Sequence, residues 1–98
     1  MVEINWLEEA RNDLKEIFDF ISQSSQSYAN RELTNILRRV QVIHHQVRAG
    51  KMVPEINRAD IREITSGNYR IIYRICNETS VDILMIHHGA RDLKKRIP

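Results

Sequence analysis

The stretch from Asp60 to Arg91 constrains the fold more than any other part of the chain. Three runs rich in β-branched and aromatic residues are separated by two polar turn sequences. Runs of this composition, bounded by Gly, Asn and Ser, are typical of a three-stranded antiparallel meander. The runs are Asp60–Ile64, Tyr69–Cys76 and Val81–His88. The last run is apolar on both faces, which predicts a central strand.

The middle run of the meander has two different faces. With the period of two that strands follow, one face carries Tyr69, Ile71, Tyr73 and Ile75, and the other carries Arg70, Ile72, Arg74 and Cys76. Arginine is seldom fully buried. The second face should therefore not lie under a full core layer, whereas the first should be covered.

Two amphipathic helices precede the meander. Apolar residues recur at helical spacing over 10–21 and again over 29–47. Ser27 should cap the second helix and Gly50 should stop it. Because the polar segment between the helices is short, they should form an antiparallel hairpin. Before them, Val2–Trp6 alternates between apolar and polar residues and predicts a short strand at a sheet edge.

These elements predict an α+β domain in the order β-α-α-β-β-β, with the helical hairpin packed on a small antiparallel sheet. Six residues should form the contact between hairpin and sheet: Leu14, Phe18, Leu37, Val40, Ile71 and Tyr73. A chain of 98 residues has room for one modest core, so residues 1–98 should form a single domain.

Composition excludes several classes of protein. Hydrophobic residues make up 42% and charged residues 29% of the chain, which is typical of a globular domain and not of a disordered one. No apolar run approaches the roughly 20 residues of a membrane span, and the N-terminus lacks the basic start of a secretion signal. We therefore expect a cytoplasmic protein. The single cysteine, Cys76, should be a small residue in or near the core.

Charge is distributed unevenly along the chain. Residues 1–32 carry seven acids and three bases, a net charge of −4, while residues 33–98 carry twelve bases and six acids, a net charge of +6. This asymmetry predicts that the C-terminal part contacts an anionic partner, either nucleic acid or an acidic protein segment. A solvated basic surface would give the same pattern.

The sequence contains no motif for a metal or a nucleotide cofactor. Its three glycines are isolated, and its cysteine and four histidines have no zinc-binding spacing. His44 and His45 are neighbours on a helix and point about 100° apart, which does not suit one metal ion. One should be a charge at the helix end and the other a half-buried neighbour. We expect no cofactor and no metal.

A cluster of charged residues could nevertheless carry chemistry. It consists of Glu55, Arg62, Arg70, Arg74, His87, His88 and Arg91. A histidine with arginines and a carboxylate could cut RNA, because the arginines would stabilise the phosphorane and the titratable groups would move protons. The same set would equally form a basic socket for an acidic peptide. Ion pairs of Arg62 or Arg74 with Glu63 or Asp82 are a purely structural alternative.

Several blocks of residues resemble the RelE/ParE superfamily of toxins from bacterial type II toxin–antitoxin modules. The strongest block is Ile61–Ile64 with Gly67 and Tyr69–Arg74. The other matching marks are Trp6, Ala10, Asp13, Leu14 and Ile17, then Gly50 and Val53–Glu55, then Ile83, Leu84, Ile86, His88, Gly89 and Arg91–Leu93. The resemblance covers nearly the whole chain and implies the order of elements derived above.

The resemblance leads to two hypotheses of function. Members similar to ParE poison DNA gyrase, and members similar to RelE cut mRNA on the ribosome. Two catalytic arginines of the RelE-like branch match Arg70 and Arg91. The catalytic lysines of that branch are missing, because their positions are occupied by Ile61 and Glu63. Its C-terminal tyrosine is missing too, since the chain has Ile97 near that position. The marks Val53–Glu55 and His88–Leu93 and the long first helix resemble ParE more closely.

A ParE-like toxin has no catalytic residues of its own and is implicated in plasmid stabilisation. Its expected partners are DNA gyrase and a cognate antitoxin with an acidic C-terminal tail, with which it forms an oligomer. Contact candidates are Arg62, Arg70, Arg74, His88 and Arg91. In the alternative, a metal-independent endoribonuclease acting on ribosome and mRNA, the catalytic set is Glu55, Arg70, His87, His88 and Arg91. A third possibility is a non-toxic protein whose only ligand is the antitoxin.

Overall fold

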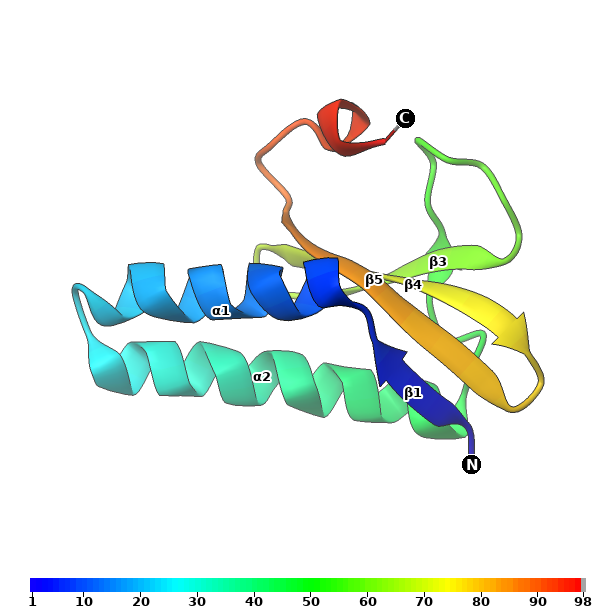
Figure 1. Cartoon of the computed structure of the whole chain (residues 1–98), viewed down its shortest axis with the longest axis horizontal. Coiled ribbons are helices and arrows are strands. Elements are labelled where there is room, and N and C mark those ends of the chain that lie inside the picture. Colours follow the sequence, from blue (N-terminus) through cyan, green and yellow to red (C-terminus); the bar gives the residue numbers. More distant parts are fainter. Residues whose placement is uncertain (98) are drawn as a thin grey trace.

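The computed structural model describes residues 1–97 and confirms the α+β architecture (Figure 1). Two helices lie side by side on one face of a five-stranded sheet with strand order β1-β5-β4-β3-β2. The elements are β1 (Glu3–Trp6), α1 (Glu8–Ser22), α2 (Gln26–His45), β2 (Lys51–Met52), β3 (Ile61–Ser66), β4 (Tyr69–Asn77), β5 (Ser80–His88) and a 3-10 turn, η1 (Leu93–Arg96).

The predicted meander is β3–β4–β5, and its strands pair antiparallel. The strand predicted at the N-terminus is β1; it lies at one edge and pairs with β5 in parallel. This makes β5 a central strand, as predicted. The two-residue β2 at the other edge was not predicted, because Lys51 and Met52 are too few to show an alternating pattern.

Strand β5 is apolar on both faces because each face meets a hydrophobic core, and a bulge sets which residues meet each core. Ile72 pairs with Met85 but Tyr73 pairs with Ile83, so Leu84 is an extra residue. The shift keeps Ile83 and Ile86 on the helix side, while Met85 faces the other side.

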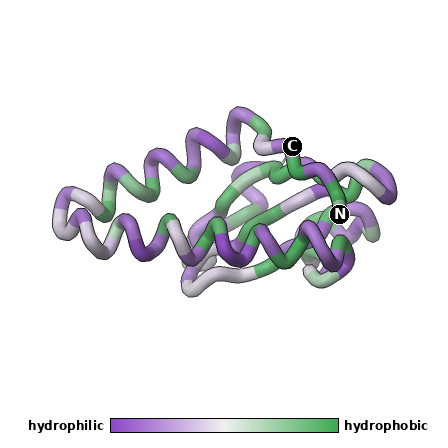
Figure 2. Tube along the Cα trace, turned by 90° about the horizontal axis from the view of Figure 1, so that it is seen from below, coloured by the Kyte–Doolittle hydropathy of each residue, from purple (hydrophilic) through white to green (hydrophobic). Residues whose placement is uncertain are grey.

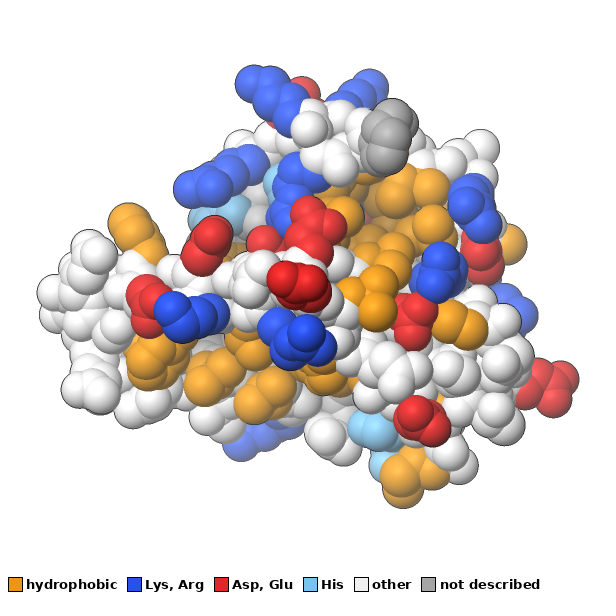
Figure 3. All heavy atoms as spheres, in the orientation of Figure 1, with side chains coloured by type: hydrophobic (Ala, Val, Ile, Leu, Met, Phe, Trp, Pro, Cys, Tyr) orange, Lys and Arg blue, Asp and Glu red, His pale blue; other side chains and the backbone are white. Residues whose placement is uncertain are grey.

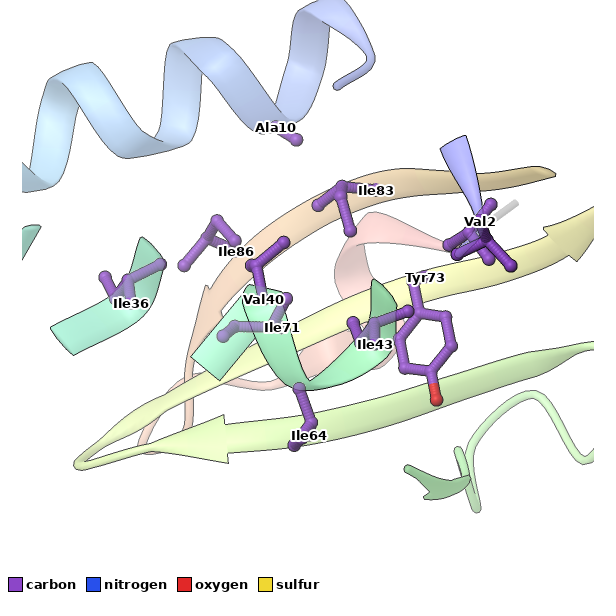
Figure 4. Packing of buried hydrophobic residues seen from close by; sticks show 11 residues of the cluster. Val2, Ala10, Ile36, Val40, Ile43, Ile64, Ile71, Tyr73, Ile83 and Ile86 are labelled. Carbon is purple, nitrogen blue, oxygen red and sulfur yellow. The ribbon is translucent and has the colours of Figure 1, made fainter. Parts of the chain in front are cut away.

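The main core lies between hairpin and sheet. Val40 and Ile43 of α2 lie beside Ile71 and Tyr73 of β4, and Ile36 lies on the side of Ile86 of β5 (Figure 4). Apolar and polar residues alternate along both helices at every turn, and this places the apolar stripe of each against the sheet (Figure 2).

The predicted hairpin–sheet contact is partly wrong. Val40, Ile71 and Tyr73 are buried, and Leu14 packs at the edge of the core. Leu37, however, is 41% exposed, and Phe18 is half-buried outside the core. Both helices carry wider apolar stripes than the sheet can cover, and the sequence does not mark which part of a stripe faces inward.

Three local predictions are corrected and one is confirmed. Ser25, not Ser27, caps α2 by accepting a hydrogen bond from the Tyr28 N–H. The helix ends at His45, well before Gly50. Of the two adjacent histidines, the first is half-buried and the second exposed, as predicted. Cys76 is exposed near the end of β4, so its assignment to the core was wrong.

A second, smaller core covers part of the other sheet face. Leu93 of η1 and Val53 pack with Ile72 and Met85, and Ile72 has no exposed surface. Arg74 on the same face is exposed, as the sequence predicted. The core around Ile72 was missed because its cover comes from irregular segments at 53–61 and 91–97, which have no periodic pattern.

Candidate functional site

Arg70 is clamped between two carboxylates on the second sheet face. β4 supplies Arg70, β3 supplies the buried Glu63, and the segment after Val53 supplies Glu55. The guanidinium donates to both Glu55 oxygens at 2.8 Å and, through Nε, to Glu63 Oε1 at 3.1 Å. A second bond joins its Nη2 to Glu63 Oε2. Bidentate pairing on both sides leaves little of the guanidinium for an external anion.

The clamp shifts the proton equilibria of its members. Hydrogen bonds from Arg70 lower the pKa of Glu55 from 4.5 to about 2, against the opposing effect of burial. The bonds to Glu55 and then Glu63 raise the pKa of Arg70 further. The cluster thus holds one fixed cation between carboxylates, and Glu55 stays ionised far below neutral pH.

His87 is buried, with 2% of its surface exposed. Its Nε2 lies 3.0 Å from the Arg91 carbonyl oxygen, and its Nδ1 lies 3.3 Å from Arg96 Nη1. A carbonyl can only accept and a guanidinium can only donate, so these contacts require the neutral ring with its proton on Nε2. Both ring nitrogens are therefore occupied within the protein.

Arg96 joins the C-terminal turn to the first helix. Its Nη2 lies 3.0 Å from Glu9 and 2.8 Å from Asp13. Asp13 Oδ2 also accepts the backbone N–H of Ile86 at 2.9 Å, where β1 no longer pairs with β5. This contact links α1, β5 and the C-terminal turn around His87.

Of the two histidines at the end of β5, His88 is the more accessible. Its ring meets Tyr69 edge-on, with centroids 5.4 Å apart, and its Nδ1 accepts the Ala90 N–H at 3.1 Å. It borders a hollow of about 400 Å³ where the β3–β4 turn meets the end of β5. The hollow is lined by Thr65, Gly67, Asn68, Tyr69, Arg70, His88, Gly89 and Ala90.

The structure separates the remaining predicted residues. Arg74 pairs with Asp82 at 2.7 Å, which is the structural role considered from the sequence. Arg62 donates to the carbonyl oxygens of Ala59 and Gly50 and has no carboxylate partner among residues 1–97. Arg91 is exposed beyond the end of β5. The structure brings Glu55 and Arg70 together, and His87 next to Arg91, but not all seven in one site.

Sequence reasoning missed an apolar groove on the helical hairpin. Trp6, Leu14, Phe18 and Leu33 line a hollow of about 420 Å³, and Arg11 and Lys15 are its charged lining residues. Figure 3 shows hydrophobic side chains gathered along this face of the hairpin, beneath charged side chains of α1. The signal was the excess width of the apolar stripes of the two helices.

Two classes of site do not occur in the described part of the chain. Within residues 1–97, no group of three His, Cys, Asp or Glu side chains is placed to hold a metal ion. Over the same residues, no helix is long and apolar enough to cross a membrane.

A family model for the ParE toxin of the type II toxin–antitoxin system parDE matches residues 4–93, nearly the whole chain. The chain belongs to the ParE toxin family. A solved structure described as the chromosomal ParDE toxin–antitoxin system from P. aeruginosa has the same fold, with a TM-score of 0.70 at 20% identity. The alignment covers 90% of this chain and 96% of that one. No curated protein sequence was found to match.

Membership of the ParE family agrees with the engaged state of the charged cluster. Arg70 and His87, two of the five residues that a ribonuclease reading requires, have their polar atoms bonded within the protein. The groove on the hairpin, the hollow beside His88 and the exposed Arg91 remain open to a partner.

Proposed function

We propose that this ParE-family protein is a growth-inhibiting toxin that acts by binding. It poisons DNA gyrase in the cytoplasm and is neutralised by a cognate antitoxin. In this function the chain supplies contact surfaces and no catalytic residue, cofactor or metal. Family membership supports the toxin–antitoxin setting, and the choice of gyrase rests on the arrangement of the charged cluster.

The doubly paired Arg70 is the observation that carries this proposal. RNA cleavage needs a cation that is free to stabilise a phosphorane as charge develops. Here Glu55 and Glu63 hold that cation, and an RNA phosphate would have to displace a bidentate carboxylate to reach it. His87, which could move protons, is buried and bonded at both nitrogens. The cluster is therefore better suited to hold the fold than to cut RNA.

The hairpin groove supports the antitoxin interaction. Its walls are apolar and its flanking side chains, Arg11 and Lys15, are basic. An acidic, amphipathic segment that folds on binding would bury its apolar face against Phe18 and Leu33 and place its carboxylates near those bases. Apolar anchors would make such a complex tight, and salt would mainly slow its formation.

Two substitutions on α1 test the groove. Phe18→Asp puts a negative charge in the groove, where the bound antitoxin would bury it, and should weaken binding of the cognate acidic antitoxin at least about 100-fold, which corresponds to the 2–4 kcal/mol of an interface hot spot. Phe20→Asp makes the same change at a side chain that is 74% exposed and outside the groove lining, and should leave binding unchanged. Calorimetry would measure both. Equal affinity for the two variants would rule out the groove, as would complete dissociation of the parent complex in moderate salt.

One observation favours the alternative, a ribosome-dependent mRNA endoribonuclease. His88 lies in an open hollow beside Tyr69 and Arg70, where a phosphodiester could enter. Induction in cells separates the two functions. A gyrase poison should cause filamentation with a DNA-damage response, whereas a ribonuclease should stop translation at once.

A further inference from the structure

The sequence between Leu33 and Pro54 contains no acidic residue. It contains Arg38, Arg39, Arg48 and Lys51, together with His44 and His45. This segment makes up most of α2 and the connection to β2. The asymmetry of charge along the chain is therefore concentrated in one part of the fold.

One face of α2 displays these charges to solvent. Arg38 and His45 are seven residues apart, which places them on the same side of the helix about 10 Å from each other. Both are exposed, as are Thr34, one turn before Arg38, and Gln41, between Arg38 and His45. The opposite side of the helix carries the buried Ile36, Val40 and Ile43, so the two faces have separate roles.

Arg48 extends this surface beyond the helix end. Tyr73 Oη donates to the Val47 carbonyl at 2.7 Å and accepts the Gly50 N–H at 3.0 Å, which fixes the segment that carries Arg48. Arg62 lies at the same junction, since it donates to the Gly50 carbonyl at 2.9 Å. We call Arg38, His45, Arg48 and Arg62 the basic stripe.

The arginines of the basic stripe have no carboxylate partner within residues 1–97. The arginines that form ion pairs there are Arg58, Arg70, Arg74 and Arg96. Glu32, the one acid of α2, precedes Arg38 by six residues and forms no ion pair within residues 1–97. The stripe therefore presents an uncompensated positive surface.

We propose that the basic stripe binds the phosphate backbone of double-stranded DNA. Proteins bind DNA phosphates through Arg, Thr and Gln side chains, and Arg38, Thr34 and Gln41 supply all three on this face of α2. Protein interfaces need an apolar core, and the exposed stripe residues include none, whereas the hairpin groove provides one. A polyanion fits the stripe better than a folded partner. Such contacts would hold the toxin beside DNA that gyrase has cleaved, although they do not depend on gyrase.

Fluorescence anisotropy with a labelled 20-base-pair duplex tests this proposal without gyrase. The parent should bind at about 50 mM salt and lose affinity steeply as salt rises, because each phosphate contact releases counterions. Arg38→Gln with Arg48→Gln should weaken binding and lower the salt slope by about 2. Lys94→Gln with Lys95→Gln removes the same charge from the exposed C-terminal turn and should keep the parental slope.

Three results would overturn the proposal. The first is a parent that does not bind the duplex at low salt. The second is an equal loss in the two double variants, which would mean that net charge alone governs binding. The third is displacement of DNA by polyglutamate at equal charge concentration, which would assign the stripe to an acidic protein surface. Thermal melting of both variants, whose mutated side chains are all exposed, verifies that they are folded.

Discussion

Gly50 lies where the connection from α2 comes closest to the sheet. A Cβ there would stand 2.6 Å from the Glu63 carbonyl oxygen and 2.7 Å from Tyr73 Oη. The first of these neighbours is backbone in β3 and cannot move away without disturbing the strand. Glycine is needed here for close approach, not for an unusual backbone angle.

Gly50→Ala should therefore destabilise the domain by about 1–3 kcal/mol, the usual range for overpacking, or more. Gly67→Ala is the matched comparison, because it should lose stability through backbone strain and not through overpacking. Nothing lies within 4 Å of its added Cβ, but its φ of +56° is unfavourable for alanine, which should cost about 1–2 kcal/mol. Urea unfolding measures both. A Gly50→Ala variant as stable as the parent would show that the junction has room for a methyl group.

The clamp around Arg70 gives a pH dependence with a definite sign. Glu55 has a pKa of about 2 in the folded protein and an ordinary value of 4.5. A lowered folded pKa stabilises the protein above pH 4.5, and this stabilisation is lost as the pH falls from 4.5 towards 2.

Glu55→Gln should consequently reduce the loss of stability between pH 5 and pH 2.5, while lowering stability at pH 7. Glu78→Gln, an exposed carboxylate in the β4–β5 turn, is the control and should follow the parent. Urea midpoints at the two pH values measure the difference. Parental acid sensitivity in Glu55→Gln would mean that the clamp is not closed in solution.

Among the elements, some apolar residues of the sheet and hairpin form the main core, and others line the open groove. Ile71 of β4 is fully buried under α2, whereas Phe18 of α1 lines the open groove. Ile71→Ala should cost about 2–5 kcal/mol of stability. Phe18→Ala should cost clearly less, because that ring lies outside the main core and lines the open groove. If chemical denaturation gives equal losses, the assignment of Phe18 to the groove is wrong.

The C-terminal turn is the element that sequence patterns did not reveal. Leu93 has 1% exposure and closes the second core over Ile72. Leu93→Ala should cost about 2–5 kcal/mol, although it lies close to the chain end. Lys94→Ala, on the exposed side of the same turn, should change stability by no more than about 0.5 kcal/mol. Similar melting temperatures for the parent and Leu93→Ala would show that the second core does not stabilise the domain.

How far the sequence predicts this molecule depends on periodicity. The meander and the two helices have strong periods of two and 3.6, and their order was predicted correctly, whereas Phe18 and Leu37 were wrongly placed against the sheet. The Arg70 clamp was not predicted, because Glu55, Glu63 and Arg70 meet only through strand register and an irregular segment. The groove was not predicted either, because an apolar stripe looks the same whether a sheet covers it or a partner does.

At the scale of the whole molecule, the protein presents three distinct surfaces. The hairpin carries an apolar groove, the solvent side of α2 carries the basic stripe, and the far face of the sheet carries the closed Arg70 clamp. The groove and the basic stripe are suited to binding partners, and the Arg70 clamp is suited to stabilising the fold. This arrangement supports the proposed inhibition by contact, and none of the four histidines should then be essential for chemistry.

The most direct test compares two cleavage reactions for the parent, His87→Ala and His88→Ala. One reaction contains gyrase, plasmid and ATP, and the other contains programmed ribosomes and mRNA. A toxin that acts on gyrase by contact should give linearised plasmid as the parent and as each folded histidine variant, and should leave mRNA intact throughout. Codon-positioned mRNA cuts that fall by the 10²–10⁴ expected of a lost general acid in one variant, with no linearised plasmid, would contradict it.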